Sequence, residues 1–450
     1  MNTIAIPMII NKTLTIFLAT LALLITLEGL SQEGTGRLNK AASSQEEPVL
    51  IKNAHVYPVS EPDFQEGLLA FEDGTITFVG KAEEFNQDTS GWHIIDAESK
   101  KLYPGIIALN TRVGLVEIDR IDATKDYRET GTFNPNVRSK TAYNTESDII
   151  PTTRANGVLL SQVSPSGGLM PGQSSVMAMD GWNWEDATYA PDNGLHLNWP
   201  SRISSPGWWG NPEDWEKAEV NEELDKIYDF FEDAYSYHQN PEPDKKNLRL
   251  EALEQLFEGE QKLFVRARRP KAIKEAIELA NKYDFDLVLK GVREIEPVLD
   301  LVRENEAGVI ISRTHRNPSR PHDDIDKAYH LPQLLAKADI PFSYSRHHSW
   351  RIRNFPFYAG SAVGHGLSKE EALRSITLYP AELLGIDDRT GTLEEGKDAN
   401  FILSQGDVMD MKSSRIEEAF LKGRQLDLYH HQEQLFDIYM ERFDLPYPDN

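Results

Sequence analysis

The middle of this 450-residue chain alternates short apolar runs with amphipathic stretches, and that alternation limits the folds it can adopt. Residues 270–283, 295–305 and 328–338 have helical patterns between such runs. The alternation is typical of parallel β/α architecture, in which helices connect successive strands. Candidate strands lie at residues 106–109, 158–163, 176–179, 195–197, 263–265, 287–289, 309–311 and 342–344. Eight strands predict an α/β fold with a TIM-like (β/α)8 barrel over residues 104–385.

The segments on both sides of this barrel have strand patterns of another kind. Candidate strands before the barrel lie at residues 49–57, 67–71, 75–79 and 92–95. We expect residues 49–103 and residues 386–426 to form the two parts of one small composite β-sandwich. Residues 213–260 are long and charged and predict a helical insertion in the barrel. Residues 427–450 predict a C-terminal helix and tail.

The first residues have the pattern of a targeting segment. Lys12 precedes the apolar run 13–27, and small residues follow it, so residues 1–31 predict a secretory signal peptide. An uncleaved membrane anchor is the alternative, since the apolar stretch nearly reaches the length of a bilayer span. Residues 32–48 are polar and predict a linker. The chain has no cysteine, which excludes a lipoprotein, a disulfide and a catalytic thiol. We expect export to the periplasm or exterior of a bacterium.

The charge of the chain narrows the class of its partners. Lysine and arginine number 47 against 72 aspartates and glutamates, a net charge of −25. Nucleic acids and anionic membranes require a basic surface, so neither is an expected partner beyond the signal segment.

Two motifs mark the beginning and the end of the predicted barrel. Tyr103-Pro104-Gly105 opens the first, which continues through Asn110 and Arg112. The second is Gly391-Thr392-Leu393-Glu394-Glu395-Gly396-Lys397-Asp398-Ala399-Asn400. In this order, over about residues 49–426, the chain resembles the amidohydrolase superfamily, and its imidazolonepropionase-like branch in particular. The resemblance implies metal-assisted hydrolysis of non-peptide carbon–nitrogen bonds, as in cyclic amides, by a metal-activated water.

The metal-ligand positions that the resemblance implies hold other residues here. The superfamily places histidines on strands one, five and six and an aspartate on strand eight. In this sequence those strands end in Asn110 and Arg112, in Arg266 and in Lys290, and strand eight has no aspartate. Strand four offers His196, where some members place a metal ligand or a substrate contact. One imidazole does not hold a divalent ion against water, so we expect no metal and no other cofactor.

The substituted positions predict a cluster of cations at the barrel mouth. Arg112, Arg266 and Lys290 would repel one another unless a counterion neutralises them. One possibility is an internal salt-bridge network with acidic residues of the first rim loop, namely Glu117, Asp119, Asp126 and Glu129. The other is a pocket that binds a carboxylate or phosphate group through the forked geometry of arginine.

Three functional hypotheses follow from these residues. The first is a catalytically degenerate barrel that binds a small anionic ligand or partners an active homologous amidohydrolase. The second is an active hydrolase with an altered, metal-free site around His196, Lys290 and His347. The third is a structural protein of the cell envelope. Whether the chain is an enzyme stays open at this point.

Overall fold

The computed structural model describes residues 40–204, 216–217, 220–240, 245–318, 323–346 and 348–447. The predicted signal peptide, the first half of the predicted linker, His347 and parts of the predicted insertion lie outside the described residues. No helix in the described part of the chain is both long and apolar enough to span a membrane.

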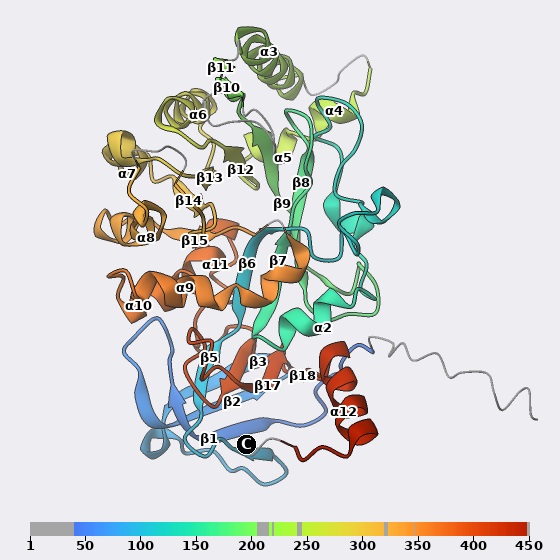
Figure 1. The fold of residues 1–450 in the computed structure, drawn as a ribbon, viewed down its shortest axis with the longest axis vertical. Coiled ribbons are helices and arrows are strands. Elements are labelled where there is room, and N and C mark those ends of the chain that lie inside the picture. Colours follow the sequence, from blue (N-terminus) through green and yellow to red (C-terminus); the bar gives the residue numbers. More distant parts are fainter. Residues whose placement is uncertain are drawn as a thin grey trace, which may run out of the picture. The chain divides into compact units, whose positions relative to one another are not determined.

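Eight strands form the predicted barrel (Figure 1). They are β6 (Ile106–Thr111), β7 (Val158–Val163), β8 (Gly172–Ala178), β9 (Thr188–Asn198), β12 (Lys262–Arg266), β13 (Leu287–Val292), β14 (Gly308–Ile311) and β15 (Phe342–Tyr344). Neighbours in the sheet follow chain order, and a parallel bridge between Leu109 and Ser345 brings the last strand to the first. The barrel prediction is therefore confirmed. The apolar runs arise because these strands are buried on both faces.

One strand runs opposite to the predicted direction. β8 is antiparallel to both β7 and β9, whereas the other neighbouring pairs in the sheet are parallel. Residues 164–171 and 179–187, which connect these three strands, contain no helix. A parallel connection needs a dozen or more residues, so these short loops produce hairpins instead. The loop 164–171 consequently lies at the end of the barrel where the parallel strands terminate.

Helices cover the outside of the barrel with apolar stripes. They are α2 (Ile149–Arg154), α6 (Pro270–Tyr283), α7 (Leu299–Glu304), α8 (Lys327–Lys337), α9 (Pro356–Val363), α10 (Lys369–Arg374) and α11 (Leu378–Leu384). In α6 the buried residues Ile273, Ala276 and Ile277 recur at helical spacing. This one-sided burial fixes which face of the helix packs on the strands.

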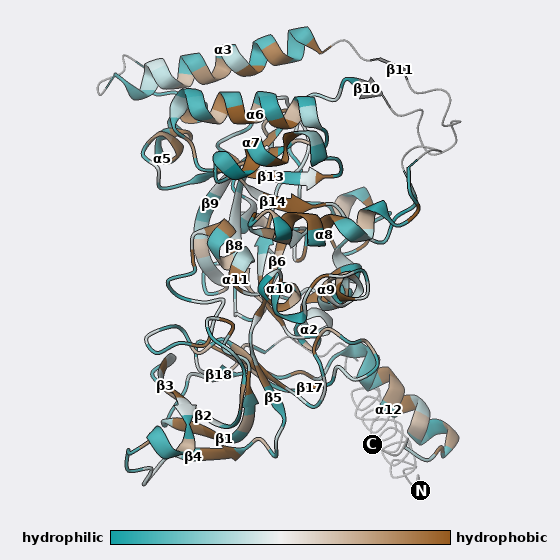
Figure 2. Cartoon of the chain, turned by 90° about the vertical axis from the view of Figure 1, so that its left-hand side faces the viewer, coloured by the Kyte–Doolittle hydropathy of each residue, from teal (hydrophilic) through white to brown (hydrophobic). Residues whose placement is uncertain are grey.

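Three helices occupy the region predicted as an insertion. They are α3 (Asn221–His238), α4 (Leu248–Glu251) and α5 (Glu254–Phe257), and β10 (Ile203–Ser204) pairs with β11 (Glu216–Lys217) nearby in the chain. The ring of Phe231 in α3 lies 6.0 Å from that of Tyr283 at the end of α6. Figure 2 shows α3 alongside α6. The long helix is thus anchored to the barrel by aromatic packing.

Both flanking segments contribute to one eight-stranded sheet. Its strands are β1 (Val49–Val56), β2 (Phe64–Glu72), β3 (Thr75–Lys81), β4 (His93–Asp96), β5 (Lys101–Pro104), β16 (Phe401–Ser404), β17 (Ile416–Leu421) and β18 (Arg424–Gln425). β5 pairs antiparallel with β16, which joins the two segments. The rings of Phe71, Phe401 and Phe420 pack within 5.3 Å of one another in its core. The composite β unit is confirmed, as a single hydrogen-bonded sheet. α12 (His431–Phe443) follows it.

A polar network connects this sheet to the barrel through the second motif. The Tyr189 hydroxyl of β9 donates to Asp398 at 2.6 Å, and Arg389 donates to the same carboxylate at 3.0 Å. The Asn400 side-chain amide donates to the Tyr189 hydroxyl at 3.2 Å. The Asp-Ala-Asn part of the motif therefore has a structural role, because it holds the returning chain against a barrel strand.

A buried ion pair makes a second connection between distant segments. Arg154 and Asp180 are 4% and 5% exposed, and their closest side-chain atoms, Nη1 and Oδ1, are 3.3 Å apart. Arg154 Nε also donates to the carbonyl oxygen of Asp427 at 2.7 Å. The backbone N–H of Ala42 donates to the Asp180 carboxylate at 3.2 Å. Segments from the start, middle and end of the described chain thus meet at one pair of charges.

Candidate functional site

Asn110 closes the barrel at the end of its first strand. Its φ of 51° lies in the left-handed region, which asparagine tolerates better than most residues, and the pairing of β6 with β7 shifts register there. The Asn110 backbone N–H donates to Gln162 Oε1 at 3.1 Å, and its side-chain amide donates to Ser345 Oγ at 2.9 Å. Asn110 therefore links β6 to the residue after β15, where the superfamily resemblance implied a metal ligand.

Arg112 lies at the mouth with its guanidinium partly satisfied. Nη2 donates to Ser166 Oγ at 3.0 Å, in the loop that joins β7 to β8. The guanidinium carbon lies 3.8 Å from the ring centroid of Tyr127, a cation–π contact. Its Nε is buried and has no hydrogen-bond acceptor in the described part of the chain. Burial, with a smaller repulsion from Arg266, holds the pKa of Arg112 below its ordinary value.

Lys290 lies deeper and contacts an imidazole rather than a carboxylate. It is 4% exposed, and its Nζ is in hydrogen-bond contact with Nδ1 of the buried His196. The His196 ring stacks on Phe264 at 5.1 Å between centroids, which fixes the orientation of the ring. Burial, followed by repulsion from Arg266 and Arg112, holds the pKa of Lys290 well below its ordinary value. Burial also lowers the pKa of Arg266.

Three of the four acidic residues named for the first rim loop contact other groups. Glu117 accepts hydrogen bonds from Asn144 and Ser147, at 3.3 and 2.9 Å. Asp119 forms an ion pair with His348 at 3.0 Å. Glu129 accepts from the backbone N–H of its neighbour Thr130.

No carboxylate of the described residues lies within 4.0 Å of a charged nitrogen of Arg112, Arg266 or Lys290. Glu117 instead accepts hydrogen bonds from an amide and a hydroxyl, and Glu129 accepts one from the adjacent backbone N–H. Asp119 contacts His348. The described residues therefore do not form the internal salt-bridge network that the sequence left open.

A cavity of about 570 Å³ opens at the mouth, and its lining is basic. Asn110, Arg112, Arg266 and Lys290, which the sequence analysis singled out, line it together. Its described lining has no aspartate or glutamate. The eight lysines and arginines that line it are Arg112, Arg266, Arg268, Lys290, Arg293, Arg313, Arg346 and Arg351. The mouth is therefore a concave surface of one charge sign, which focuses the electrostatic field inside it.

The sequence analysis did not predict five of these cations, namely Arg268, Arg293, Arg313, Arg346 and Arg351. Their positions relative to the strand ends could have indicated four of them. Arg268, Arg293, Arg313 and Arg346 each follow the end of a parallel barrel strand by one or two residues. The carboxyl ends of such strands all point to the mouth, so arginines at this position converge. The Nε atoms of Arg293 and Arg346 are buried without an acceptor in the described chain, as is that of Arg112. Buried donors of this kind normally have a partner, and here three face one cavity.

Two further basic cavities adjoin the mouth. One, of about 460 Å³, shares Asn198, Arg266, Arg268 and Arg293 with the mouth cavity and adds Arg202, Arg269 and Lys271. The other shares Arg313, Arg346 and Arg351 with the mouth cavity. Basic side chains therefore continue along the rim in both directions, although Glu275 pairs with Arg202, Glu294 pairs with Arg269, and Asp407 and Asp410 line the second of these cavities.

The residues at the mouth do not fit the divalent metals that the superfamily resemblance implies. Arginine has no lone pair for a cation, and the Asn110 amide nitrogen is a donor to Ser345. Metal sites also need anionic or imidazole ligands at close range. His196 is the one imidazole among the ligand positions that the resemblance implies, and His348 is the one histidine in the described lining of the cavity. A dication placed among Arg112, Arg266 and Lys290 would add to the repulsion there.

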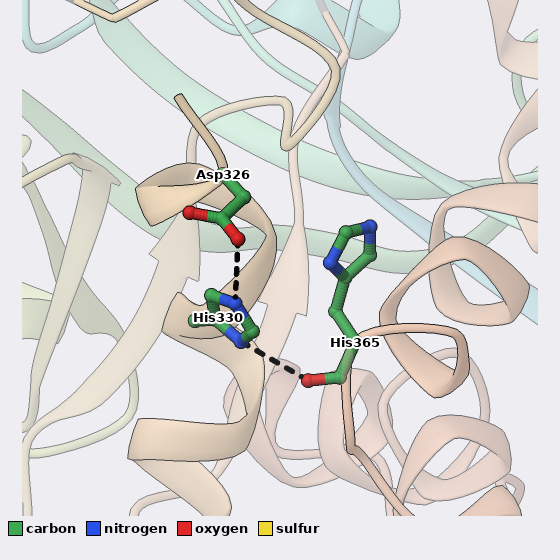
Figure 3. A group of neighbouring side chains, drawn as sticks. All are labelled: Asp326, His330 and His365. Carbon is green, nitrogen blue, oxygen red and sulfur yellow. Dashed lines mark hydrogen bonds and ion pairs between the residues drawn. The ribbon is translucent and has the colours of Figure 1, made fainter. Parts of the chain in front are cut away.

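The described residues contain one group with metal-binding geometry, and it lies elsewhere (Figure 3). Asp326, His330 and His365 each offer a ligand atom within 4.8 Å of the others. His330 lies 3.1 Å from the Asp326 carboxylate through Nε2, and its Nδ1 lies 3.1 Å from the carbonyl oxygen of His365. None of the three lines the mouth cavity, so an ion held there would not contact a ligand in the mouth.

The comparisons with known proteins agree with the fold. An Amidohydrolase family model matches residues 352–426. A 61-residue segment is 44% identical to N-acetylglucosamine-6-phosphate deacetylase of Danio rerio, which covers 14% of this chain and 14% of that protein. The chain thus matches only a small part of the length of this curated relative.

Solved structures with the same architecture cover most of the chain. An amidohydrolase from Thermotoga maritima MSB8 superposes with a TM-score of 0.72 at 23% identity, over 85% of this chain and all of that one. Molinate hydrolase superposes with a TM-score of 0.55 at 12% identity, over 85% of this chain and 95% of that one. A Xaa-Pro dipeptidase superposes with a TM-score of 0.53 at 13% identity, over 85% of this chain and all of that one. The resemblance to the amidohydrolase superfamily is confirmed in fold and in the sequence of the last part of the barrel.

Proposed function

We propose that the barrel mouth binds a small anionic ligand and does not carry out the metal-assisted hydrolysis that the superfamily resemblance implies. The observation that carries this proposal is the lining of the mouth: eight lysines and arginines and, among the described lining residues, no carboxylate. The chain as a whole has 72 acidic residues against 47 basic ones. A cavity with the average composition of this chain would have more acidic than basic residues. The net charge of the mouth is therefore opposite in sign to that of the whole chain.

The energetics favour an anion that enters this cavity. Arg112 and Arg266 lose hydration on burial, and no carboxylate of the described chain lies within 4.0 Å of their guanidinium nitrogens, since Asp119 acts on Arg112 only from a greater distance. Neither group therefore has a close counterion, which is the condition under which buried charge destabilises a fold. A bound carboxylate or phosphate supplies that counterion. The guanidinium groups offer paired donors that match either group, and the volume suits a small molecule.

Inorganic phosphate is expected to bind the purified protein with an affinity that falls as salt rises. Isothermal titration calorimetry at low and at physiological ionic strength measures this directly. Partly buried charges are screened less than exposed ones, so binding is expected to persist at 0.15 M salt in weakened form. Citrate, with several carboxylates, is expected to bind more tightly than acetate because basic side chains continue into the adjoining cavities. No measurable binding of either phosphate or citrate at low salt would refute the proposal.

Metal analysis tests the second half of the proposal. We expect protein purified without chelators to contain no stoichiometric zinc or manganese in the mouth, and to show no turnover of cyclic amides. Any ion that is found can be assigned with His330→Ala, which removes a ligand of the distant cluster, and His196→Ala, which removes the imidazole in contact with Lys290. Stoichiometric metal lost only with His196→Ala, together with turnover, would show that the proposal is wrong.

A further inference from the structure

The contact between Lys290 and His196 is a reactive arrangement that anion binding alone does not use. Lys290 is one of the residues that line the mouth cavity, and His196 Nδ1 is the hydrogen-bond partner of its Nζ. Desolvation and two neighbouring guanidinium groups disfavour the ammonium form of Lys290. A neutral lysine amine keeps a nucleophilic lone pair, which an ammonium lacks.

We propose that Lys290 forms a reversible imine with an aldehyde or ketone that carries a carboxylate or phosphate group. This proposal rests on the anion-binding function above, because the arginines of the mouth would hold the anionic group of the same molecule.

The positions of the residues support this division of roles. Val265 and Leu289 are paired across β12 and β13, so Arg266 and Lys290 occupy the next positions on adjacent strands. Both line the mouth cavity, and so does Arg112, which directly follows β6. An anion bound by Arg266 and Arg112 therefore places the rest of its molecule beside Nζ. Proximity of this kind converts a bimolecular addition into a reaction within one complex.

The chemistry balances without an oxidant or a reductant. The Nζ lone pair attacks the carbonyl carbon, a carbon–nitrogen bond forms, and the carbonyl oxygen becomes a hydroxyl. The hydroxyl then leaves as water while the carbon–nitrogen double bond forms, so that one amine and one carbonyl give one imine and one water. His196 Nδ1 is in hydrogen-bond contact with Nζ, and in the tautomer that leaves Nδ1 unprotonated it can take the proton released by the attacking amine and return it to the leaving oxygen.

Reductive trapping tests the proposal on the full-length protein. Pyridoxal 5′-phosphate is the anionic probe and pyridoxal its uncharged match, each added with sodium borohydride, which delivers hydride to the imine carbon. Intact mass followed by peptide mapping counts and locates the adducts. We expect one adduct at Lys290, formed roughly tenfold faster with the phosphorylated probe, since charged hydrogen bonds hold its phosphate.

Lys282 provides an internal control on the same molecule. It is an exposed lysine whose ion pair with Glu232 raises its pKa, so its labelling is expected to increase only at higher pH. Labelling at Lys290 is expected to begin at lower pH and to favour the phosphorylated probe more than labelling at Lys282 does. Equal rates at the two lysines for both probes would overturn the proposal.

Two variants separate the imine from anion binding. Lys290→Met is expected to lose the adduct at residue 290 while phosphate still binds to the remaining arginines. His196→Ala is expected to slow adduct formation several-fold without loss of phosphate binding, which is the result for a proton-transfer role. Phosphate binding in the wild type with no adduct at Lys290 would refute imine formation alone. Absence of both would refute the proposed function as well.

Discussion

Replacing Arg266 by glutamine is expected to weaken phosphate binding at the mouth by roughly ten- to a hundredfold, the loss associated with one charged hydrogen-bond donor. Arg266 lines both the mouth cavity and the adjoining one, so its guanidinium is central to the basic surface. Because it is partly buried, its interaction with an anion is stronger than that of an exposed arginine. Calorimetric titration of the variant at fixed ionic strength measures the change.

Arg303→Gln is the matched control for this prediction. Arg303 lies on α7, is paired with Asp300 at 3.0 Å and does not line the mouth cavity, yet its replacement changes the net charge by the same amount. We expect it to leave phosphate affinity within about twofold, because exposed charges are screened by salt. If both variants weakened binding equally, the effect would be one of net charge, and the assignment of the site to the mouth would be wrong. Thermal unfolding should also show that Arg266→Gln is not destabilised, since it relieves repulsion with Arg112 and Lys290.

Replacing Asp180 by asparagine is expected to lower the free energy of unfolding by about 3–5 kcal/mol, the typical cost of breaking a buried ion pair from one side. Arg154 is 4% exposed and would remain charged beside a neutral amide. Asp180 also lies 3.6 Å from Arg424 of β18, so a second guanidinium would lose its nearby carboxylate. Urea denaturation followed by circular dichroism measures the loss as a shift of the midpoint.

Asp300→Asn is the control for the ion-pair prediction. Its pair with Arg303 is exposed and spans three residues of one helix, so its removal is expected to cost less than about 1 kcal/mol. A loss for Asp180→Asn that is no greater than that of Asp300→Asn would mean that the hydrogen bonds of Arg154 to backbone carbonyls alone hold these segments together.

The fold was largely predictable because buried strands have a recognisable apolar pattern in the sequence. Strands covered on both faces are continuous apolar runs, and each predicted run of the barrel overlaps a strand of the structure. The direction of β8 was not predictable from the same pattern. Its apolar residues suggested a strand from residue 176, whereas pairing begins at Gly172, so the preceding loop looked long enough for a parallel connection. Because the start of β8 was predicted four residues too late, the strand was expected to be parallel to its neighbours, whereas it is antiparallel.

The site was predictable in its central residues and not in its surroundings. Positions at the ends of strands are fixed by the barrel, which is why Asn110, Arg112, Arg266 and Lys290 could be expected to share one mouth, and they line one cavity. The partners of charged groups depend on loop conformation instead. Glu117 and Asp119 are close to Arg112 in sequence, yet Ser147 and His348 from distant segments attract their carboxylates. Sequence separation therefore could not decide between a salt-bridge network and an open anion site.

The pairing of β5 with β16 has a consequence for the order in which the protein can be made. Tyr103 and Ile402 are neighbours in the finished sheet, although they lie 299 positions apart in the sequence. Until β16 has been synthesised, the inner edge of β5 and one side of the phenylalanine cluster have no cover, and such an exposed apolar edge favours association with other chains. The nascent polypeptide thus cannot complete this sheet before β16 has been synthesised, and premature termination before residue 401 would leave a product with an open edge at β5.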